Sequence, residues 1–260
     1  MIENEGVEPQ KILCLTFSNT AAREMKTKIG ENYDVNVFTY HEFCLNIMEE
    51  FPEQFNNENS NIISDSHKRN LLKECIDELH PVAYNNEKNN PYQYSQDILD
   101  GIEEIKKYRM KREEFFTNLQ ENPMWTKRLI QLKKDQEENP TKGKKDEIES
   151  LTQKIGQMME LWGFYELYTK KMKELNYIDF HDMINMVLEK FEDENSSLLE
   201  EIAYKYEYIL VDEYQDTNKA QNDIVFALSK FCPNIFVVGD DDQIIYTFQG
   251  ANLDTISCRG

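Results

Sequence analysis

The residues best suited to chemistry are two adjacent acids, Asp212 and Glu213, which directly follow the apolar run 209–211. Apolar residues that end in Asp-Glu form a Walker B pattern, in which the Asp holds Mg²⁺ and the Glu orients and deprotonates an attacking water. The alternative is a strand that merely ends in two exposed acids, because acids are common in this chain. The run by itself leaves both interpretations open.

Polar and aromatic residues follow other short apolar runs in the same way. The four resulting clusters are Thr-Phe-Ser-Asn at 16–19, Thr-Tyr-His at 39–41, Asp-Glu-Tyr-Gln-Asp at 212–216 and Gly-Asp-Asp-Asp-Gln at 239–243. In an open parallel sheet, ligands bind at the carboxyl ends of the strands. Four such clusters on one edge therefore predict a site.

Aromatic side chains lie in or just beyond these clusters, at Phe17, Tyr40, Tyr246 and Phe248. Aromatics usually pack in a core, but beside polar loops they also serve as stacking platforms for unpaired bases. The acidic cluster 239–243 has its own alternatives, a plain turn or a Ca²⁺ loop, although the EF-hand spacing is not met.

The elements that must position these clusters are short β-strands and helices in alternation. Strands are predicted where the chain has compact apolar runs, at 11–16, 35–39, 208–211 and 235–238. The first run is almost unbroken, as in a strand that is covered on both faces. Asn19 is placed to cap the helix that follows it.

The middle of the chain, residues 62–192, has an almost wholly helical pattern. From Ile148 onward the apolar residues are spaced by three and four, which predicts a long amphipathic helix. Gly156 and Gly163 would weaken this helix as an autonomous coiled coil, so we expect it to pack within a helical subdomain. The economical architecture is an α/β fold, a parallel sheet interrupted by a large helical insertion.

Charge is distributed unevenly along the chain. The formal net charge is −20, which disfavours contact with nucleic acid unless basic residues cluster. Residues 105–145 form one such cluster, with a local charge of +6; the alternative is an ordinary solvated helical surface. The cysteine spacing indicates neither disulfides nor zinc, and no run is long enough to cross a membrane, so we expect a cytoplasmic protein.

Together, these residues resemble the UvrD/Rep/PcrA-type superfamily 1 DNA helicases. The similar stretches are 16–25 (motif Ia), 38–44 (motif Ib), 178–183 (the family's Leu-Asp-Phe-Asp-Asp-Leu stretch), 211–218 (motif II, VDEYQDTN) and 238–251 (motif III, VGDDDQIIYTFQGA). Long motifs in the right order are far more specific than any one of them alone.

The resemblance implies a RecA-like motor domain formed by 1–60 and 176–260, with an all-helical inserted subdomain at 61–175. It implies ATP and Mg²⁺ as cofactors, with Asp212 as the Mg²⁺ ligand and Glu213 as the general base. Gln243 would couple the γ-phosphate to the DNA track.

The resemblance also implies contacts with DNA. Phe17, Tyr246 and Phe248 would stack on bases. Asn19, Thr39 and His41 would contact the single-stranded backbone. Tyr40 is also placed among the DNA-binding residues. The basic stretch would face duplex DNA at a single-strand/duplex junction.

Two departures from the family pattern affect what this chain does alone. It contains no Gly-x-x-x-x-Gly-Lys-[Ser/Thr] sequence, and Gln249 stands where many relatives carry an Arg that contacts DNA. We therefore expect a fragment whose phosphate loop lies upstream and whose second RecA-like domain lies downstream. One hypothesis is an ATP-dependent 3′→5′ helicase or the motor of a helicase–nuclease. The other is a non-catalytic DNA-binding or interaction module.

Overall fold

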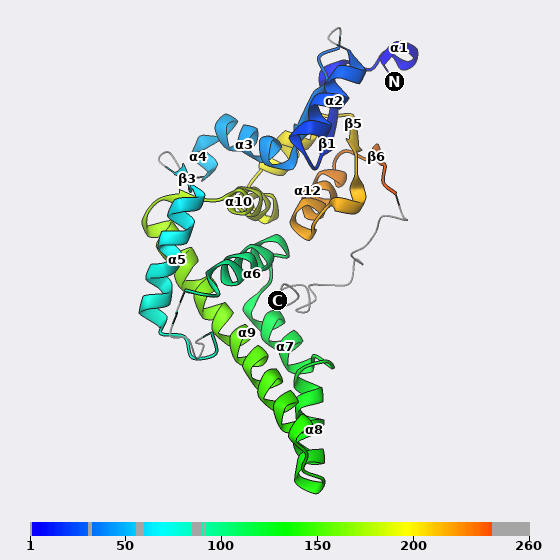
Figure 1. Cartoon of the computed structure of the whole chain (residues 1–260). Helices are drawn as coiled ribbons and strands as arrows, with labels where there is room; N and C mark the ends of the chain where they lie inside the picture. The colour runs from blue at the N-terminus through cyan, green and yellow to red at the C-terminus, as the bar shows by residue number, and fades with distance from the viewer. Residues whose placement is uncertain (1, 31–32, 56–59, 85–89, 91, 241–260) are drawn as a thin grey trace. The chain divides into compact units, whose positions relative to one another are not determined.

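The computed structural model describes residues 2–30, 33–55, 60–84, 90 and 92–240. These residues divide into two compact units (Figure 1). Unit 1 contains the described residues of 1–60 and 179–240, and unit 2 contains those of 61–178. None of the helices described has the length and apolar character needed to span a bilayer.

Unit 1 is built on a four-stranded parallel sheet in the order β2-β1-β5-β6. Its strands are β1 (Ile12–Thr16), β2 (Asn36–Thr39), β5 (Tyr208–Val211) and β6 (Ile235–Val237). Its helices are α1 (Ile2–Glu5), α2 (Asn19–Ile29), α3 (Tyr40–Glu50), α4 (Pro52–Phe55), α10 (Phe180–Glu192), α11 (Leu198–Ala203) and α12 (Lys219–Ser229), with 3₁₀ turns η1 (Pro9–Lys11) and η2 (Tyr214–Asp216). The predicted mixed α/β fold with a parallel sheet is confirmed.

Strand β1 lies between two apolar layers, because successive side chains of a strand point to opposite faces. Leu13 and Leu15 belong to the larger core, which also contains buried residues of α3, α10, α11 and α12. Ile12 and Cys14 belong to a smaller cluster with Ala22 of α2. All five residues of β1 are buried, as its unbroken apolar run predicts.

Unit 2 is helical apart from two short strands. Its helices are α5 (Asp65–Leu79), α6 (Ser95–Lys107), α7 (Arg112–Glu121), α8 (Thr126–Glu138) and α9 (Lys142–Glu174); β3 (Asn61–Ile62) and β4 (Tyr177–Ile178) pair in parallel. The core contains fully buried residues of α5, α6, α7 and α9, among them Leu72, Ile98, Phe115 and Leu161. The sequence pattern did not predict β3 and β4.

Helix α9 confirms the long helix expected from the spacing of apolar residues, and it begins six residues earlier than the apolar pattern. Gly156 lies where this helix meets the loop that follows α5. A Cβ atom at Gly156 would come within 2.9 Å of the Ala83 Cβ, so the close approach of the loop requires a glycine.

Candidate functional site

The carboxyl ends of β1, β2, β5 and β6 lie at one edge of the unit 1 sheet, because the four strands are parallel. Thr16 is paired with Thr39, Leu15 with Val211, and Val211 with Val237. The backbone amide of Asp212 donates to the Leu15 carbonyl at 3.0 Å. The polar clusters that follow the strands therefore start from a common edge, as the sequence predicts.

Asp212 is the first residue after β5, and its side chain is half-buried. Within the described parts of the chain, no hydrogen bond or ion pair engages its carboxylate. Burial raises the pKa of the Cys14 thiol to about 11, and the negative charge of Asp212 contributes to this rise. Asp212 is thus a half-buried carboxylate that none of the described residues neutralises.

Glu213 has a left-handed backbone conformation, with φ 50° and ψ 45°, and an exposed side chain. Left-handed backbone is uncommon for a residue with a Cβ atom and marks a turn that the surrounding structure has to hold. The Gln215 side-chain amide donates to the Glu213 carboxylate at 2.5 Å. The turn after β5 is therefore fixed partly by a side chain that the sequence reasoning had not singled out.

The start of α2 differs in detail from the prediction. Ser18, rather than Asn19, is the N-cap, because its hydroxyl accepts the Ala21 amide at 3.2 Å. Asn19 is instead the first residue of the helix and is exposed. Phe17 is 51% exposed, so its ring has an accessible face next to this helix start.

The cluster at the end of β2 consists of Thr39, Tyr40 and His41, and the first two of these side chains are buried. Thr39 is 4% exposed and forms a capping box with Glu42 at the start of α3. Tyr40 is 1% exposed and packs in the main core of unit 1. Both side chains therefore contribute to the structure of unit 1, and their predicted contacts with DNA stay predictions.

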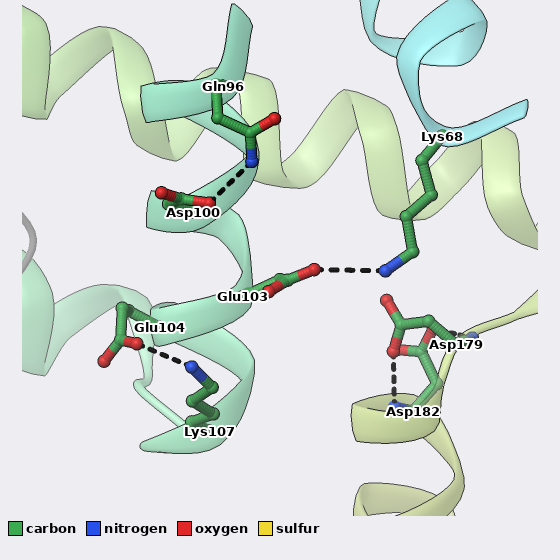
Figure 2. A network of polar contacts seen from close by, with 8 residues as sticks. All are labelled: Lys68, Gln96, Asp100, Glu103, Glu104, Lys107, Asp179 and Asp182. Carbon is green, nitrogen blue, oxygen red and sulfur yellow. Dashed lines mark hydrogen bonds and ion pairs between the residues drawn. The ribbon is translucent and has the colours of Figure 1, made fainter. Parts of the chain in front are cut away.

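His41 remains at the edge and packs against α10. Its ring lies 5.3 Å from that of Phe180 and 6.2 Å from that of His181, in both cases edge to face. Burial lowers the pKa of His41, and the charge of Asp179 opposes this shift. Figure 2 shows Asp179 and Asp182 in the capping box that starts α10.

The remaining predicted site residues, Gln243, Tyr246 and Phe248, lie outside the described residues, as does Gln249. Across the part of the chain that the structure describes, no group of three or more His, Cys, Asp or Glu side chains could hold a metal ion. Mg²⁺ usually needs only one or two protein carboxylates, since phosphate oxygens and waters complete its shell. The unengaged carboxylate of Asp212 fits that requirement.

The fold and this edge define an α/β protein with an acidic, partly desolvated strand end beside accessible polar and aromatic residues. The chain belongs to the UvrD/REP helicase N-terminal domain family, which it matches over residues 1–258. The resemblance found in the sequence is thereby confirmed.

Individual relatives carry helicase names. A probable DNA helicase II homolog of Rickettsia conorii is 30% identical over 262 residues, covering 98% of this chain and 34% of that protein. A probable DNA helicase II homolog of Mycoplasma capricolum is 26% identical, covering 98% and 31%. The ATP-dependent DNA helicase PcrA of Staphylococcus aureus is 27% identical, covering 98% and 30%. The chain spans about a third of the length of these curated relatives.

Proposed function

We propose that this chain is part of an ATP-dependent DNA helicase that moves 3′→5′ along single-stranded DNA and acts at single-strand/duplex junctions. Residues 1–60 and 176–260 are the first RecA-like motor domain in this proposal, and residues 61–175 are its inserted helical subdomain. The observation that carries the proposal is the unengaged Asp212 carboxylate next to Glu213 at the sheet edge, in a chain of the UvrD/REP family.

Asp212 and Glu213 divide the chemistry of ATP hydrolysis between them. Asp212 is the residue that would hold Mg²⁺, and the ion would supply positive charge to the phosphates. Glu213 orients the attacking water and accepts its proton, and its exposed position leaves it accessible to that water. Gln243 keeps its proposed role as the residue that couples the γ-phosphate to DNA.

Residues of the same edge provide the proposed contacts with single-stranded DNA, and two of them, Phe17 and Asn19, are exposed. Phe17 stacks on a base, which suits a motor that must accept any sequence because every base has a π-face. Asn19 and His41 contact the backbone, and Tyr246 and Phe248 stay in the proposal as further stacking residues.

The basic stretch 105–145, which lies in unit 2, is the proposed contact with duplex DNA. Arg128 is paired with Glu147, so its charge is partly neutralised by the protein. Within the described residues, by contrast, no acidic side chain pairs with four exposed lysines, Lys127, Lys133, Lys134 and Lys142. Lysines that neutralise DNA phosphates displace the counterions condensed on the DNA, so we expect this contact to weaken steeply with salt.

We further propose that this chain works within a longer polypeptide, called the complete helicase below, which supplies the phosphate loop and a second RecA-like domain. Exposed apolar side chains at β6, an edge strand of the described sheet, support this proposal. Phe236 and Val237 of β6 are 49% and 51% exposed, and Val238, which follows the strand, is 65% exposed. Proteins normally cover an apolar edge strand, because such an edge otherwise pairs with other chains.

A non-catalytic DNA-binding module is the second candidate, favoured by the lack of a phosphate-loop sequence within these 260 residues. Without phosphate-loop amides and a lysine, nothing cradles the β- and γ-phosphates. We therefore expect no measurable turnover from the 260-residue chain alone. Steady phosphate release in saturating single-stranded DNA, abolished by Glu213→Gln, would contradict this expectation.

The substitution Glu213→Gln in the complete helicase tests the main proposal. The amide is nearly isosteric but cannot accept a proton, so ATP turnover should fall about 10²–10⁴-fold. ATP affinity should stay within about twofold, measured by equilibrium binding of a fluorescent nucleotide. Glu189→Gln on the exposed surface of α10 is the matched control and should leave turnover unchanged. A collapse of ATP affinity with less than a tenfold loss of turnover would refute the role of Glu213.

A further inference from the structure

The side chain of Gln215 links two parts of the sheet edge. Its amide nitrogen donates to the Glu213 carboxylate at 2.5 Å, and its amide oxygen accepts the backbone N–H of Asp240 at 3.1 Å. Gln215 lies in the 3₁₀ turn η2 after β5, whereas Asp240 lies in the segment that follows β6. One side chain therefore spans the ends of two neighbouring strands.

An amide side chain has the chemistry that this position needs. A carboxylate only accepts hydrogen bonds and a backbone N–H only donates one, so the bridging group must offer a donor on one side and an acceptor on the other. The same requirement fixes which end of the amide is nitrogen. A glutamate at this position would keep the acceptor toward Asp240 and lose the donor toward Glu213.

The segment after β6 is fitted closely around this bridge. A Cβ atom at Gly239 would lie 2.7 Å from the amide oxygen of Gln215. The Tyr214 amide donates to the Val238 carbonyl at 3.0 Å, and the Val238 amide donates to the Val211 carbonyl at 2.8 Å. A displacement of residues 238–240 must therefore be felt by η2 and by Gln215.

We propose that Gln215 is a positioning residue, which sets the orientation of the Glu213 carboxylate according to the position of the segment after β6. The inference rests on the proposed role of Glu213 as general base. By binding one carboxylate oxygen, Gln215 leaves the other oxygen to accept a hydrogen bond from the attacking water. A shift of Asp240 pulls on the same amide, so the geometry of the base depends on residues that the chain reaches only after β6.

Three substitutions disturb this bridge in different ways. Gln215→Leu removes both hydrogen bonds, and Gln215→Glu removes the donor to Glu213 and places a second negative charge beside that carboxylate. Gly239→Ala leaves Gln215 in the sequence but displaces its amide by the added Cβ, and the backbone of Gly239 does not have the positive φ that would exclude alanine. Gln96→Leu in α6, which removes an exposed amide that donates to Asp100, is the matched control.

The first measurement uses the 260-residue chain and needs no ATP. Amide hydrogen exchange at Asp240 should become faster in Gln215→Leu and Gly239→Ala, because its acceptor is lost or displaced. Exchange should stay close to wild type in Gln96→Leu. Unchanged exchange at Asp240 in Gln215→Leu would overturn the bridge itself.

The second measurement is ATP turnover by the complete helicase. Loss of a side chain that orients a reacting group costs about 10–100-fold, so kcat should fall by that factor in Gln215→Leu, Gln215→Glu and Gly239→Ala. KM for ATP should stay within about twofold, whereas a general loss of structure would change KM and the melting temperature as well.

The outcomes of the two tests are distinguishable. If Glu213→Gln blocks turnover while Gln215→Leu keeps kcat within twofold of wild type, the positioning role is refuted and the proposed function stands. If Glu213→Gln itself turns over ATP normally, the proposed function fails, and the inference fails with it even where Asp240 exchange has changed as expected.

Discussion

Two carboxylates, one in each unit, are treated in opposite ways by the protein around them. Glu160 of α9 accepts hydrogen bonds from three successive backbone amides, those of Val82 at 2.7 Å, Ala83 at 3.0 Å and Tyr84 at 3.3 Å. Asp212 of unit 1 accepts none from the described residues. A carboxylate satisfied by backbone amides is part of the structure, whereas one left without a partner in a partly buried place is available to a ligand.

Other charged and aromatic side chains of unit 2 are likewise engaged by partners within that unit. Lys68 pairs with Glu103 at 3.0 Å and Lys107 pairs with Glu104 at 2.8 Å, as Figure 2 shows. Phe115 is fully buried and its ring lies 5.0 Å from that of Trp162, whereas Phe17 of unit 1 is half exposed. These charged and aromatic side chains of unit 2 thus stabilise the unit itself, whereas Phe17 at the sheet edge of unit 1 stays accessible.

The largest expected difference is between alanine substitutions of Phe115 and Phe17. Phe115→Ala should lower the free energy of unfolding of unit 2 by about 3–5 kcal/mol, because it leaves a cavity in a packed core. Phe17→Ala should change stability by less than about 0.5 kcal/mol and weaken binding of single-stranded DNA by about 1–3 kcal/mol. Both tryptophans of the chain, Trp125 and Trp162, lie in unit 2, so their fluorescence follows the unfolding of that unit selectively.

Fluorescence anisotropy with labelled oligo-dT and with a mixed sequence measures the binding of the Phe17→Ala protein. Stacking tolerates any base, so the loss of affinity should be similar for both oligonucleotides. Unchanged DNA affinity together with a large drop in melting temperature would assign Phe17 to packing and break the contrast.

The next difference is in the stability effects of neutralising Glu160 and Asp212. Glu160→Gln should lower the free energy of unfolding of unit 2 by about 1–3 kcal/mol, because charge-assisted bonds are lost and the new NH₂ group faces backbone donors. Asp212→Asn should leave stability within about 0.5 kcal/mol, since no described group depends on that carboxylate. Urea unfolding followed by tryptophan fluorescence for Glu160→Gln, and by circular dichroism for Asp212→Asn, checks both. Equal losses in the two variants would mean that Asp212 has a structural role.

The parallel sheet and the place of its polar edge could be predicted from the sequence, because both depend on local patterns. The run 12–16 is apolar at nearly every position, which only a strand covered on both faces requires. Asp212 is the residue immediately after another apolar run, 209–211. Asp212 could therefore be singled out as a candidate site residue without any knowledge of tertiary contacts.

Other features depend on contacts between residues far apart in the chain, or on choices between neighbours, and the sequence could not decide them. Ser18 and Asn19 are both good caps, and the backbone selects Ser18. The ring of Tyr40 was equally compatible with stacking and packing until its burial was known. Gln215 gains its importance from Asp240, which lies 25 residues further on.

The two glycines of α9 give the smallest expected effects and the sharpest test of close packing in unit 2. Apart from its own helix backbone and chain neighbours, no described residue has an atom within 4 Å of a Cβ added at Gly163. Gly163→Ala should therefore raise the free energy of unfolding by about 0.5–1 kcal/mol through helix propensity alone. Gly156→Ala gains the same propensity but meets the Ala83 Cβ at 2.9 Å. It should therefore destabilise unit 2, by about 1–3 kcal/mol, since Glu160 and Gln157 hold the loop in place. The double variant Gly156→Ala with Ala83→Gly should recover most of that loss in urea unfolding followed by tryptophan fluorescence. If Gly156→Ala were as stabilising as Gly163→Ala, the loop at Ala83 would not be clamped to α9, and Glu160 would lose its place as the structural counterpart of Asp212.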